Sequence, residues 1–334
     1  NNMSNILFQN ALKRISQKTP PIWFMRQAGR YHSHYQNLKE KYSFEKLCKN
    51  PELASEVACG PVNEFDFDIS ILFSDILFLL EGLGLPLHFN PAPIFGDFIT
   101  KDNLSEYSNI DKAIEHMEFQ SKAIRITREQ LPNSKSLIGF VGGPWTLLRF
   151  ATNKKKNLNK IEDFHFDFLK NILLPLIKKN INLQLDAGAE IVMIFDSGLN
   201  DIQSDFFKLN YLSLIEDIIK SFPNKIGYYF KGKELNDFSI IFNSSLAGIG
   251  INHTINIKDT FGLYKSGFIQ GNFDESKMIL DQSQLIEEIK YFCEEMKSIE
   301  SLEGWICSLG HGINKLTPEK NVHLFIETIR KNFS

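Results

Sequence analysis

The chain has 334 residues, of which 43% are hydrophobic and 23% are charged, so it can bury a large core and is neither a disordered nor a collagen-like protein. Its net charge of −3 argues against a basic protein that coats nucleic acid. The four cysteines contain no C-x-x-C pair, which predicts reduced thiols in the cytoplasm. The most apolar stretch, residues 69–87, is interrupted by Asp75 and Glu81, and no secretory signal is evident, so neither secretion nor a membrane span is expected.

The first part of the chain is predicted to be mainly helical. Apolar residues recur at helical spacing in 5–16, 38–49 and 52–65, and Pro51 suits the start of the last of these helices. A short extended segment, 22–25, lies between the first two helices. We expect residues 1–66 to form an N-terminal extension that packs on the rest of a single domain, 1–334.

Short buried strands then alternate with helices. The predicted strands are 69–73, 137–141, 190–195, 225–230, 247–251, 268–271 and 304–308, and the predicted helices are 163–185, 205–221, 282–297 and 318–331. This alternation predicts a parallel sheet covered by helices. An eighth strand is expected at either 238–242 or 22–25, and the count favours an α/β fold with one (β/α)8 TIM barrel. Residues 87–99, with Pro91 and Pro93, suggest an inserted loop or hairpin.

Polar residues follow several of the predicted strands. Asp75, Ser197 and Asp274 each come two or three residues after the end of a predicted strand, and His311 lies between two glycines after the last strand. The three residues Asp75, Ser197 and Asp274 would also suit the caps of the helices that follow them. In a barrel, however, all these positions lie on the face where barrel enzymes place their active sites. The joint pattern, with His311 as well, therefore favours a site over three unrelated caps.

Two of the seven arginines, Arg26 and Arg30, lie four residues apart and flank Gly29. A guanidinium group grips a carboxylate or phosphate through two hydrogen bonds, which lysine does not do. The alternative is an ordinary surface loop with two incidental arginines. We interpret the pair as part of a site for a small polyanion.

Metal and nucleotide motifs are weak in this chain. His32 and His34 form an H-x-H pair and Cys307 lies four residues before His311, but neither pair has the further ligands that zinc normally needs. A triad of Ser197, His311 and Asp75 lacks the G-x-S-x-G motif, and no P-loop or dinucleotide fingerprint is present. No metal site is predicted.

Several blocks together resemble the uroporphyrinogen decarboxylase family. The sequence PIWFMRQAGRY at 21–31 is similar to the N-terminal signature of that family, and IGFVGGPWTL at 138–147 to its second signature. Further matching blocks follow in the same order: FSDIL at 73–77, QGN at 270–272 and LGHG at 309–312. The resemblance extends from about residue 20 to the last helix.

The resemblance implies a single distorted barrel with an N-terminal helical extension, usually assembled as a homodimer. The implied reaction removes CO2 from the acetate side chains of uroporphyrinogen III, leaves methyl groups and gives coproporphyrinogen III, with neither a metal nor an organic cofactor. Decarboxylation leaves an electron pair on carbon that must be accepted, and a protonated pyrrole of the substrate can accept it. The protein then has to hold the macrocycle, supply protons and stabilise a transient positive charge.

The resemblance also assigns roles to individual residues. Asp75 is expected to accept hydrogen bonds from the pyrrole N–H groups and to favour the cationic intermediate. Arg26 and Arg30 are expected to bind carboxylates, and one of them to take part in proton delivery. His311 and Ser197 are expected to contact the acidic side chains. The other expected contacts are the backbone amides of Gln27 and Ala28 and the side chains of Ile76, Phe140, Phe150 and Phe195.

The chain departs from the family pattern at several positions. Phe150 replaces the expected tyrosine, Asn252 the expected acid and Ser308 the expected asparagine, and the lysines at 154–156 fall where a glycine-rich loop is expected. Residues 198–200 also differ. Two alternatives therefore stay open: a non-catalytic tetrapyrrole-binding relative, and a zinc-dependent methyltransferase on the same barrel. The methyltransferase would need cysteine and histidine ligands at strand ends, where only Cys307 is present.

Overall fold

A computed structural model describes residues 3–153, 158, 160–243 and 245–334 of the chain, so the lysines at 154–156 lie outside the described residues. The strands are β1 (Ile69–Ile71), β2 (Leu87–Phe89), β3 (Pro93–Phe95), β4 (Ser136–Gly142), β5 (Val192–Asp196), β6 (Ile226–Phe230), β7 (Gly248–Gly250), β8 (Phe268–Phe273) and β9 (Trp305–Leu309). The α-helices are α1 (Ile6–Leu12), α2 (Ser33–Lys41), α3 (Phe44–Lys49), α4 (Pro51–Phe65), α5 (Phe78–Gly82), α6 (Ile110–His116), α7 (Glu118–Gln130), α8 (Pro144–Ala151), α9 (Asp163–Asp167), α10 (Leu174–Ala187), α11 (Ser204–Phe206), α12 (Leu212–Ser221), α13 (Ile257–Leu263), α14 (Gln282–Lys297) and α15 (Glu319–Asn332). Three 3₁₀ turns, η1 (Leu104–Tyr107), η4 (Leu235–Asn243) and η5 (Glu275–Ile279), and two π-helical segments, η2 (Phe168–Leu173) and η3 (Phe207–Tyr211), complete the described elements.

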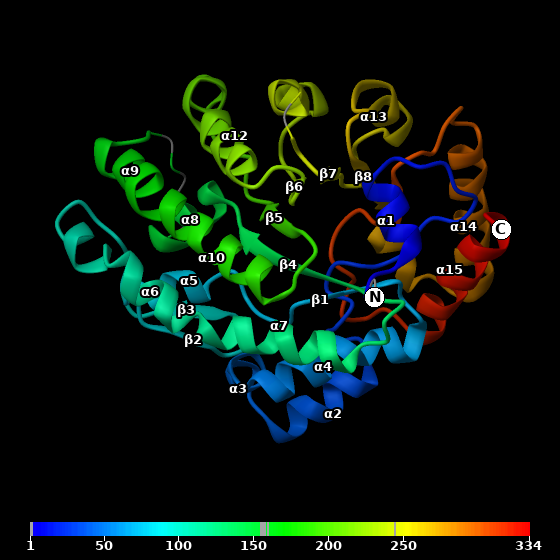
Figure 1. The fold of residues 1–334 in the computed structure, drawn as a ribbon, viewed down its shortest axis with the longest axis horizontal. Coiled ribbons are helices and arrows are strands. Elements are labelled where there is room, and N and C mark those ends of the chain that lie inside the picture. Colours follow the sequence, from blue (N-terminus) through cyan, green and yellow to red (C-terminus); the bar gives the residue numbers. More distant parts are fainter. Residues whose placement is uncertain (1–2, 154–157, 159, 244) are drawn as a thin grey trace.

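The seven predicted strands form one parallel sheet in the order β1-β4-β5-β6-β7-β8-β9. The sheet is curled, and the helices lie around its outside (Figure 1). Sequential strands are neighbours throughout, apart from the β2–β3 hairpin inserted between β1 and β4. The prediction of a distorted α/β barrel and that of a hairpin within 87–99 are both confirmed.

The eighth strand position is taken by the segment that contains Ile22. Ile22 forms a parallel bridge with Cys307 of β9, and on its other side it exchanges hydrogen bonds with Asp68, just before β1. The Ile22 N–H donates to the Asp68 carboxylate at 2.7 Å, and the Asp68 N–H donates to the Ile22 carbonyl at 3.0 Å. This segment joins the two edge strands, whereas the alternative position, 238–242, lies in the 3₁₀ turn η4, so a strand there was wrong.

The inside of the barrel is filled by alternate residues of the strands. Large apolar side chains that point inward include Ile138, Met193, Tyr229 and Phe268. Helix α1 adds Phe8 and Ala11 to the same cluster and caps the amino-terminal end of the barrel, where the Asn5 N–H donates to Ser136 Oγ at 2.9 Å. Because α1 covers this end, any open site on the barrel has to lie at the carboxyl ends of the strands, the face called the barrel mouth below.

The predicted helices are mostly present, with two changes. The helix expected at 38–49 is two helices, α2 and α3, because Ser43 ends the first segment and accepts a hydrogen bond from the Lys46 N–H as the N-cap of the second. The helix expected at 5–16 ends at Leu12, and Arg14 takes a positive φ of 53°. Across the described ranges, no helix combines the length and apolar character that crossing a membrane requires.

Candidate active site

The N-terminal signature folds into a compact loop at the barrel mouth. Arg26 adopts a left-handed backbone conformation with φ of 61°, which is uncommon for a residue that is not glycine. The Tyr31 hydroxyl donates to the Gln27 carbonyl at 2.7 Å and ties the loop together. The Arg26 side chain lies over Gly312: a Cβ atom built on Gly312 would come within 2.6 Å of Arg26 Cδ. The first signature and the LGHG block are therefore in contact, although 286 residues separate Arg26 from Gly312 in the sequence.

Asp75 follows β1 and reaches the same region. Its Oδ1 accepts the Leu77 N–H at 2.8 Å, which fixes the carboxylate at the start of the turn before α5. Burial raises the pKa of Asp75 to about 6, while that hydrogen bond and the positive charge of Arg26 act in the opposite direction. The residue nevertheless keeps some solvent access. Asp75 is thus a recessed but reachable carboxylate, mostly ionised at neutral pH.

His311 lies after β9 and is half-buried. Burial, followed by the positive charges of Lys231 and Arg26, lowers the pKa of His311 to about 4, so the ring is neutral at pH 7. Its Nδ1 accepts the Gly312 N–H at 2.6 Å. A neutral imidazole that accepts at Nδ1 must carry its proton at Nε2. His311 therefore presents an N–H donor, with no positive charge of its own.

Arg26 is the residue that joins these groups. Its charge acts on the carboxyl of Asp75, on the imidazole of His311 and on the phenol of Tyr229. Arg26 is exposed, as are the other two predicted polar residues, Arg30 and Ser197. The charge of Arg30 acts on the phenol of Tyr35, and Ser197 directly follows β5.

Aromatic side chains line the inner side of the barrel below the polar groups. Phe140 and Phe195 pack with their ring centroids 5.6 Å apart, and Phe195 meets Tyr229 edge-on at 6.2 Å. Ile76 packs close to Gly142 at the end of β4, where an added Cβ would approach Ile76 Cβ to 3.1 Å. The three residues predicted as apolar walls, Ile76, Phe140 and Phe195, are each partly buried.

Gln27 has a structural role that the sequence did not indicate. Its side chain accepts the Phe24 N–H at 3.0 Å and donates to the Ile69 carbonyl at 2.9 Å, so it joins the closing segment to β1. Its own N–H donates to the Phe24 carbonyl at 3.1 Å, so a ligand carboxylate would have to share this donor. Ala28 packs against the small cluster around Tyr35, and Phe150 packs against the main hydrophobic core.

A buried amide network supports Phe140. In a parallel sheet, alternate residues of a strand form their backbone hydrogen bonds with the same neighbouring strand. The N–H and carbonyl of Phe140 therefore point toward β1. However, β1 pairs only as far as Ile138 of β4, so it cannot bond to Phe140. The Gln184 side chain replaces the missing strand: it accepts the Phe140 N–H at 2.9 Å and donates to the Phe140 carbonyl at 2.8 Å. Gln120 links Gln184 to Ser74, the residue before Asp75. Sequence analysis missed this network because its members are scattered along three segments.

A second buried network involves Asp196 at the end of β5. The carboxylate accepts hydrogen bonds from the hydroxyls of Tyr211, Tyr228 and Thr146, the last two at 2.6 and 2.7 Å. Burial raises the pKa of Asp196, and these hydrogen bonds partly offset that effect. Asp196 is fully buried, so it holds α8 and η3 on the barrel and does not face the mouth.

Two of the departures from the family pattern, Asn252 and Ser308, differ in their local hydrogen bonding. The Asn252 Oδ1 accepts the Thr254 N–H at 2.9 Å, a bond that an aspartate would also make, so this replacement keeps the turn after β7. Ser308 is fully buried on β9, and within the described residues its hydroxyl has no hydrogen-bond partner.

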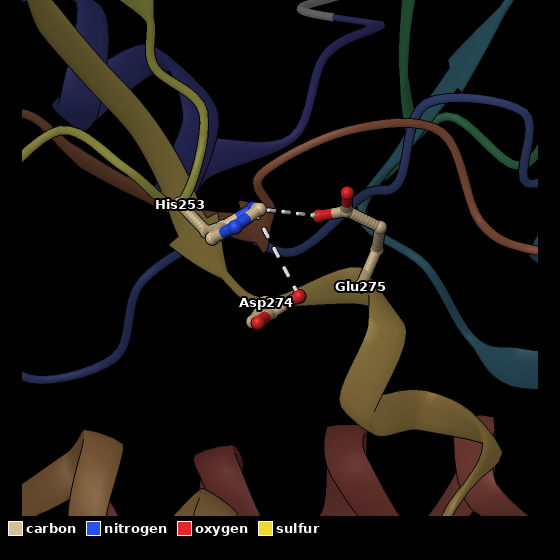
Figure 2. A group of neighbouring side chains, drawn as sticks. All are labelled: His253, Asp274 and Glu275. Carbon is tan, nitrogen blue, oxygen red and sulfur yellow. Dashed lines mark ion pairs between the residues drawn. The ribbon is translucent and has the colours of Figure 1, made fainter.

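One group of side chains has the composition of a metal site. His253, Asp274 and Glu275 place one ligand atom each within 4.8 Å of one another (Figure 2). The His253 Nδ1 lies 3.5 Å from Glu275 Oε2 and 3.9 Å from Asp274 Oδ1. The same Asp274 oxygen already accepts the Ser276 N–H as the cap of η5, so the cluster is also explained as an ion-pair group.

The pairs singled out in the sequence are not part of a larger ligand group. Cys307 belongs to the main core between the sheet and the helices, whereas its neighbours Ile306 and Ser308 point into the barrel. The rings of His32 and His34 lie 5.7 Å apart, and within the described residues neither belongs to a group of three potential ligands. The four cysteines are free and buried, and burial holds the pKa of the Cys307 thiol well above its usual value.

Comparison with known proteins agrees with this arrangement. Residues 3–332 match the family model of uroporphyrinogen decarboxylase (URO-D). The chain is 32% identical over 353 residues to the uroporphyrinogen decarboxylase of Orientia tsutsugamushi (strain Ikeda), covering 99% of both chains. It is 30% identical over 344 residues to that of Francisella tularensis subsp. novicida (strain U112), covering 97% of this chain and 98% of the relative. Among solved structures, a methyltransferase from Methanosarcina mazei superposes with a TM-score of 0.81 at 16% identity, covering 99% of this chain and 100% of the other, which shows a shared fold.

The parallel barrel, with polar groups at the carboxyl ends of its strands, is the architecture of a barrel enzyme. Within that class the chain belongs to the uroporphyrinogen decarboxylase family of carboxy-lyases, as its sequence blocks predicted.

Proposed function

We propose that this protein decarboxylates the four acetate side chains of uroporphyrinogen III and releases coproporphyrinogen III. The observation that carries the proposal is that Arg26 lies over Gly312, next to His311, with its charge acting on both His311 and Asp75. Together they offer one recessed carboxylate, one guanidinium and one neutral N–H donor. This set suits a ring that carries N–H groups at its centre and carboxylates at its rim.

In the proposed mechanism Asp75 binds the centre of the macrocycle. Pyrrole N–H groups donate to its carboxylate, and a proton added to a pyrrole carbon creates a cation that the negative charge stabilises. As the C–CO2 bond breaks, its electron pair flows into the protonated ring and leaves an exocyclic methylene. A second proton converts this methylene carbon to a methyl group, and the first proton then leaves the ring carbon, which restores the pyrrole. With a pKa of about 6, Asp75 is mostly ionised at pH 7.

Arg26 and His311 act on the rim in this scheme. Arg26 pairs with a substrate carboxylate, and the Nε2–H of His311 donates to another. The aromatic rings of Phe140 and Phe195 pack beneath the macrocycle and keep water away, which strengthens the charged contacts. The homodimer and the cytoplasmic location expected from the resemblance are further proposals, and sedimentation velocity of the purified protein tests the first.

The decisive assay incubates the protein without oxygen with freshly reduced uroporphyrinogen III and separates the oxidised porphyrins by their number of carboxyl groups. Stepwise appearance of hepta-, hexa-, penta- and tetracarboxylic products supports the proposal. Tight binding without turnover would instead identify a non-catalytic tetrapyrrole-binding relative, the outcome that the replacement of tyrosine by Phe150 makes worth testing.

A further inference from the structure

We propose that Lys231 and the Nε2–H of His311 form a carboxylate-binding subsite on the β6–β9 side of the barrel mouth. The proposal rests on the proposed function, because it takes a rim carboxylate of the tetrapyrrole as the ligand. It adds a second cation to Arg26 and makes Lys231 a residue that affects substrate binding.

The first argument is the direction of the Lys231 side chain. Along β6, Tyr228 and Phe230 pack in the outer core, whereas Tyr229 packs inside the barrel. The ladder continues one residue beyond β6, since the Lys231 N–H donates to the Asp196 carbonyl at 3.3 Å. Side chains alternate between the two faces of a strand, so Lys231 projects on the same side as Tyr229.

The second argument is the position of Tyr229 relative to His311. The Tyr229 hydroxyl donates to the Gly310 carbonyl at 2.7 Å, and its ring meets the His311 ring nearly at right angles, with centroids 6.1 Å apart. Lys231 comes two residues after Tyr229, at the level of the mouth. Its ammonium therefore faces the imidazole of His311, in keeping with the effect of its charge on that ring.

The third argument is that the Lys231 ammonium is not used by the fold. Within the described residues it has no hydrogen bond or ion pair, whereas Lys233, two residues later, donates to the Ile202 carbonyl at 2.9 Å and lies over the Phe207 ring. Lys231 is also half-buried. A half-buried cation without an anionic partner beside a neutral N–H donor is suited to a carboxylate that arrives with a ligand.

Acidic groups also lie in this sector of the mouth. In the strand order β6-β7-β8-β9, His253 follows β7 and the two acids Asp274 and Glu275 follow β8, so along the rim they come between Lys231 and His311. Both acids face the imidazole of His253, at 3.9 Å and 3.5 Å. Lys231 therefore supplies the positive charge that a rim carboxylate needs in this sector.

A spectroscopic test asks whether Lys231 faces His311, with no need for substrate. The pKa of His311, about 4 in the wild type, is followed by NMR of protein labelled at histidine Cε1. Lys231→Met removes a nearby positive charge, so this pKa should rise. Lys265→Met makes the same change at an exposed position before β8, at the opposite end of the barrel, and should leave it unchanged. Equal pKa values in the wild type and Lys231→Met would overturn the proposal.

A second test measures binding and turnover in the same proteins. In the decarboxylase assay Lys231→Met should raise KM about tenfold, the loss expected for one charged hydrogen bond, and change kcat by less than about twofold. Lys231→Arg should recover most of the affinity, and Lys265→Met should match the wild type. Equilibrium binding of oxidised uroporphyrin, followed by fluorescence, should weaken about tenfold in Lys231→Met as well. Thermal unfolding confirms that the variants are folded.

The outcomes separate this inference from the proposed function. If the wild type turns over and Lys231→Met has an unchanged KM, the subsite is wrong and the decarboxylase stands. If the wild type binds uroporphyrin without turnover and Lys231→Met weakens binding, the decarboxylase is wrong and the subsite stands. If the wild type neither binds uroporphyrin nor turns over uroporphyrinogen, the decarboxylase and the subsite are both wrong.

Discussion

The Arg26 side chain lies directly over Gly312. An added Cβ at Gly312 would approach Arg26 Cδ to 2.6 Å and its Cγ and Nε to 3.0 Å, so the guanidinium reaches the mouth only because position 312 has no side chain. Arg26 in turn acts on Asp75 and His311. The glycine after His311 thus belongs to the arrangement of the site as much as the charged residues do.

Gly312→Ala is expected to displace Arg26 and reduce kcat/KM about tenfold or more, because the guanidinium loses its position against the substrate carboxylate. The φ of Gly312 is not in the left-handed region, so alanine fits the backbone and the fold should persist. Gly262→Ala on α13 is the control, since a Cβ there meets nothing within 4 Å. Wild-type kinetics in Gly312→Ala would show that a side chain at residue 312 does not displace Arg26 from its working position.

Asp75→Asn should make the protein more stable and much less active. The pKa of Asp75 is about 6 in the folded chain and close to 3.9 when unfolded, so the folded state holds this proton more tightly. The free energy of unfolding therefore falls as pH rises from about 4 to 6, and at pH 7 the ionised Asp75 costs on the order of 1–3 kcal/mol. Asparagine avoids that cost and still accepts the Leu77 N–H.

Urea unfolding at pH 7 and at pH 4 measures this difference, which should be large at pH 7 and small at pH 4. Turnover of Asp75→Asn should fall by about 100-fold or more, because the neutral amide cannot stabilise the cationic intermediate. An Asp75→Asn protein that is less stable at pH 7, or that keeps its activity, would contradict the role given to this carboxylate.

The acid side of the pH profile should report Asp75. The pH dependence of kcat/KM reports the ionisation of groups in the free enzyme. The value of kcat/KM should therefore decline below pH 6, as Asp75 takes up a proton. His311, with a pKa of about 4, stays neutral above pH 5 and adds no further decline there. Arg26→Met removes the charge that lowers the pKa of Asp75, so the decline should move to higher pH, whereas Arg26→Lys should move it less. An unchanged pH profile in Arg26→Met would show that the charge of Arg26 does not act on the carboxyl of Asp75.

Gln184→Leu should destabilise the protein by about 2–4 kcal/mol, because it leaves both the N–H and the carbonyl of Phe140 unpaired. Asn182→Leu is the matched control: it lies on the same helix and is exposed, so its effect should stay within about 0.5 kcal/mol. Chemical denaturation compares the two. Equal stability of both variants would mean that water replaces the Gln184 amide.

Residue patterns predicted the strands of the parallel sheet well because these strands are almost wholly buried and appear as short apolar runs. They also placed Asp75 and His311 at one end of the barrel, since parallel strands end on a common face. They did not predict Gln184, whose role depends on where β1 stops relative to β4, or Lys231, whose direction depends on the ladder continuing past β6. The break at Ser43 was missed because the apolar spacing of α2 and α3 runs on across it.

Tyr229→Phe and Tyr228→Phe form a pair that separates stability from substrate binding. Tyr229 donates to the Gly310 carbonyl at 2.7 Å inside the barrel, and Tyr228 donates to Asp196 at 2.6 Å on the outer side. Each variant loses one buried hydrogen bond, so both should be destabilised by about 1–2 kcal/mol. Only Tyr229→Phe loosens the loop that carries His311, so only this variant should raise KM, by about threefold to tenfold. Urea unfolding and steady-state kinetics on both proteins provide the test. A raised KM in Tyr228→Phe but not in Tyr229→Phe would show that the Asp196 network, and not the phenol beside His311, positions the substrate.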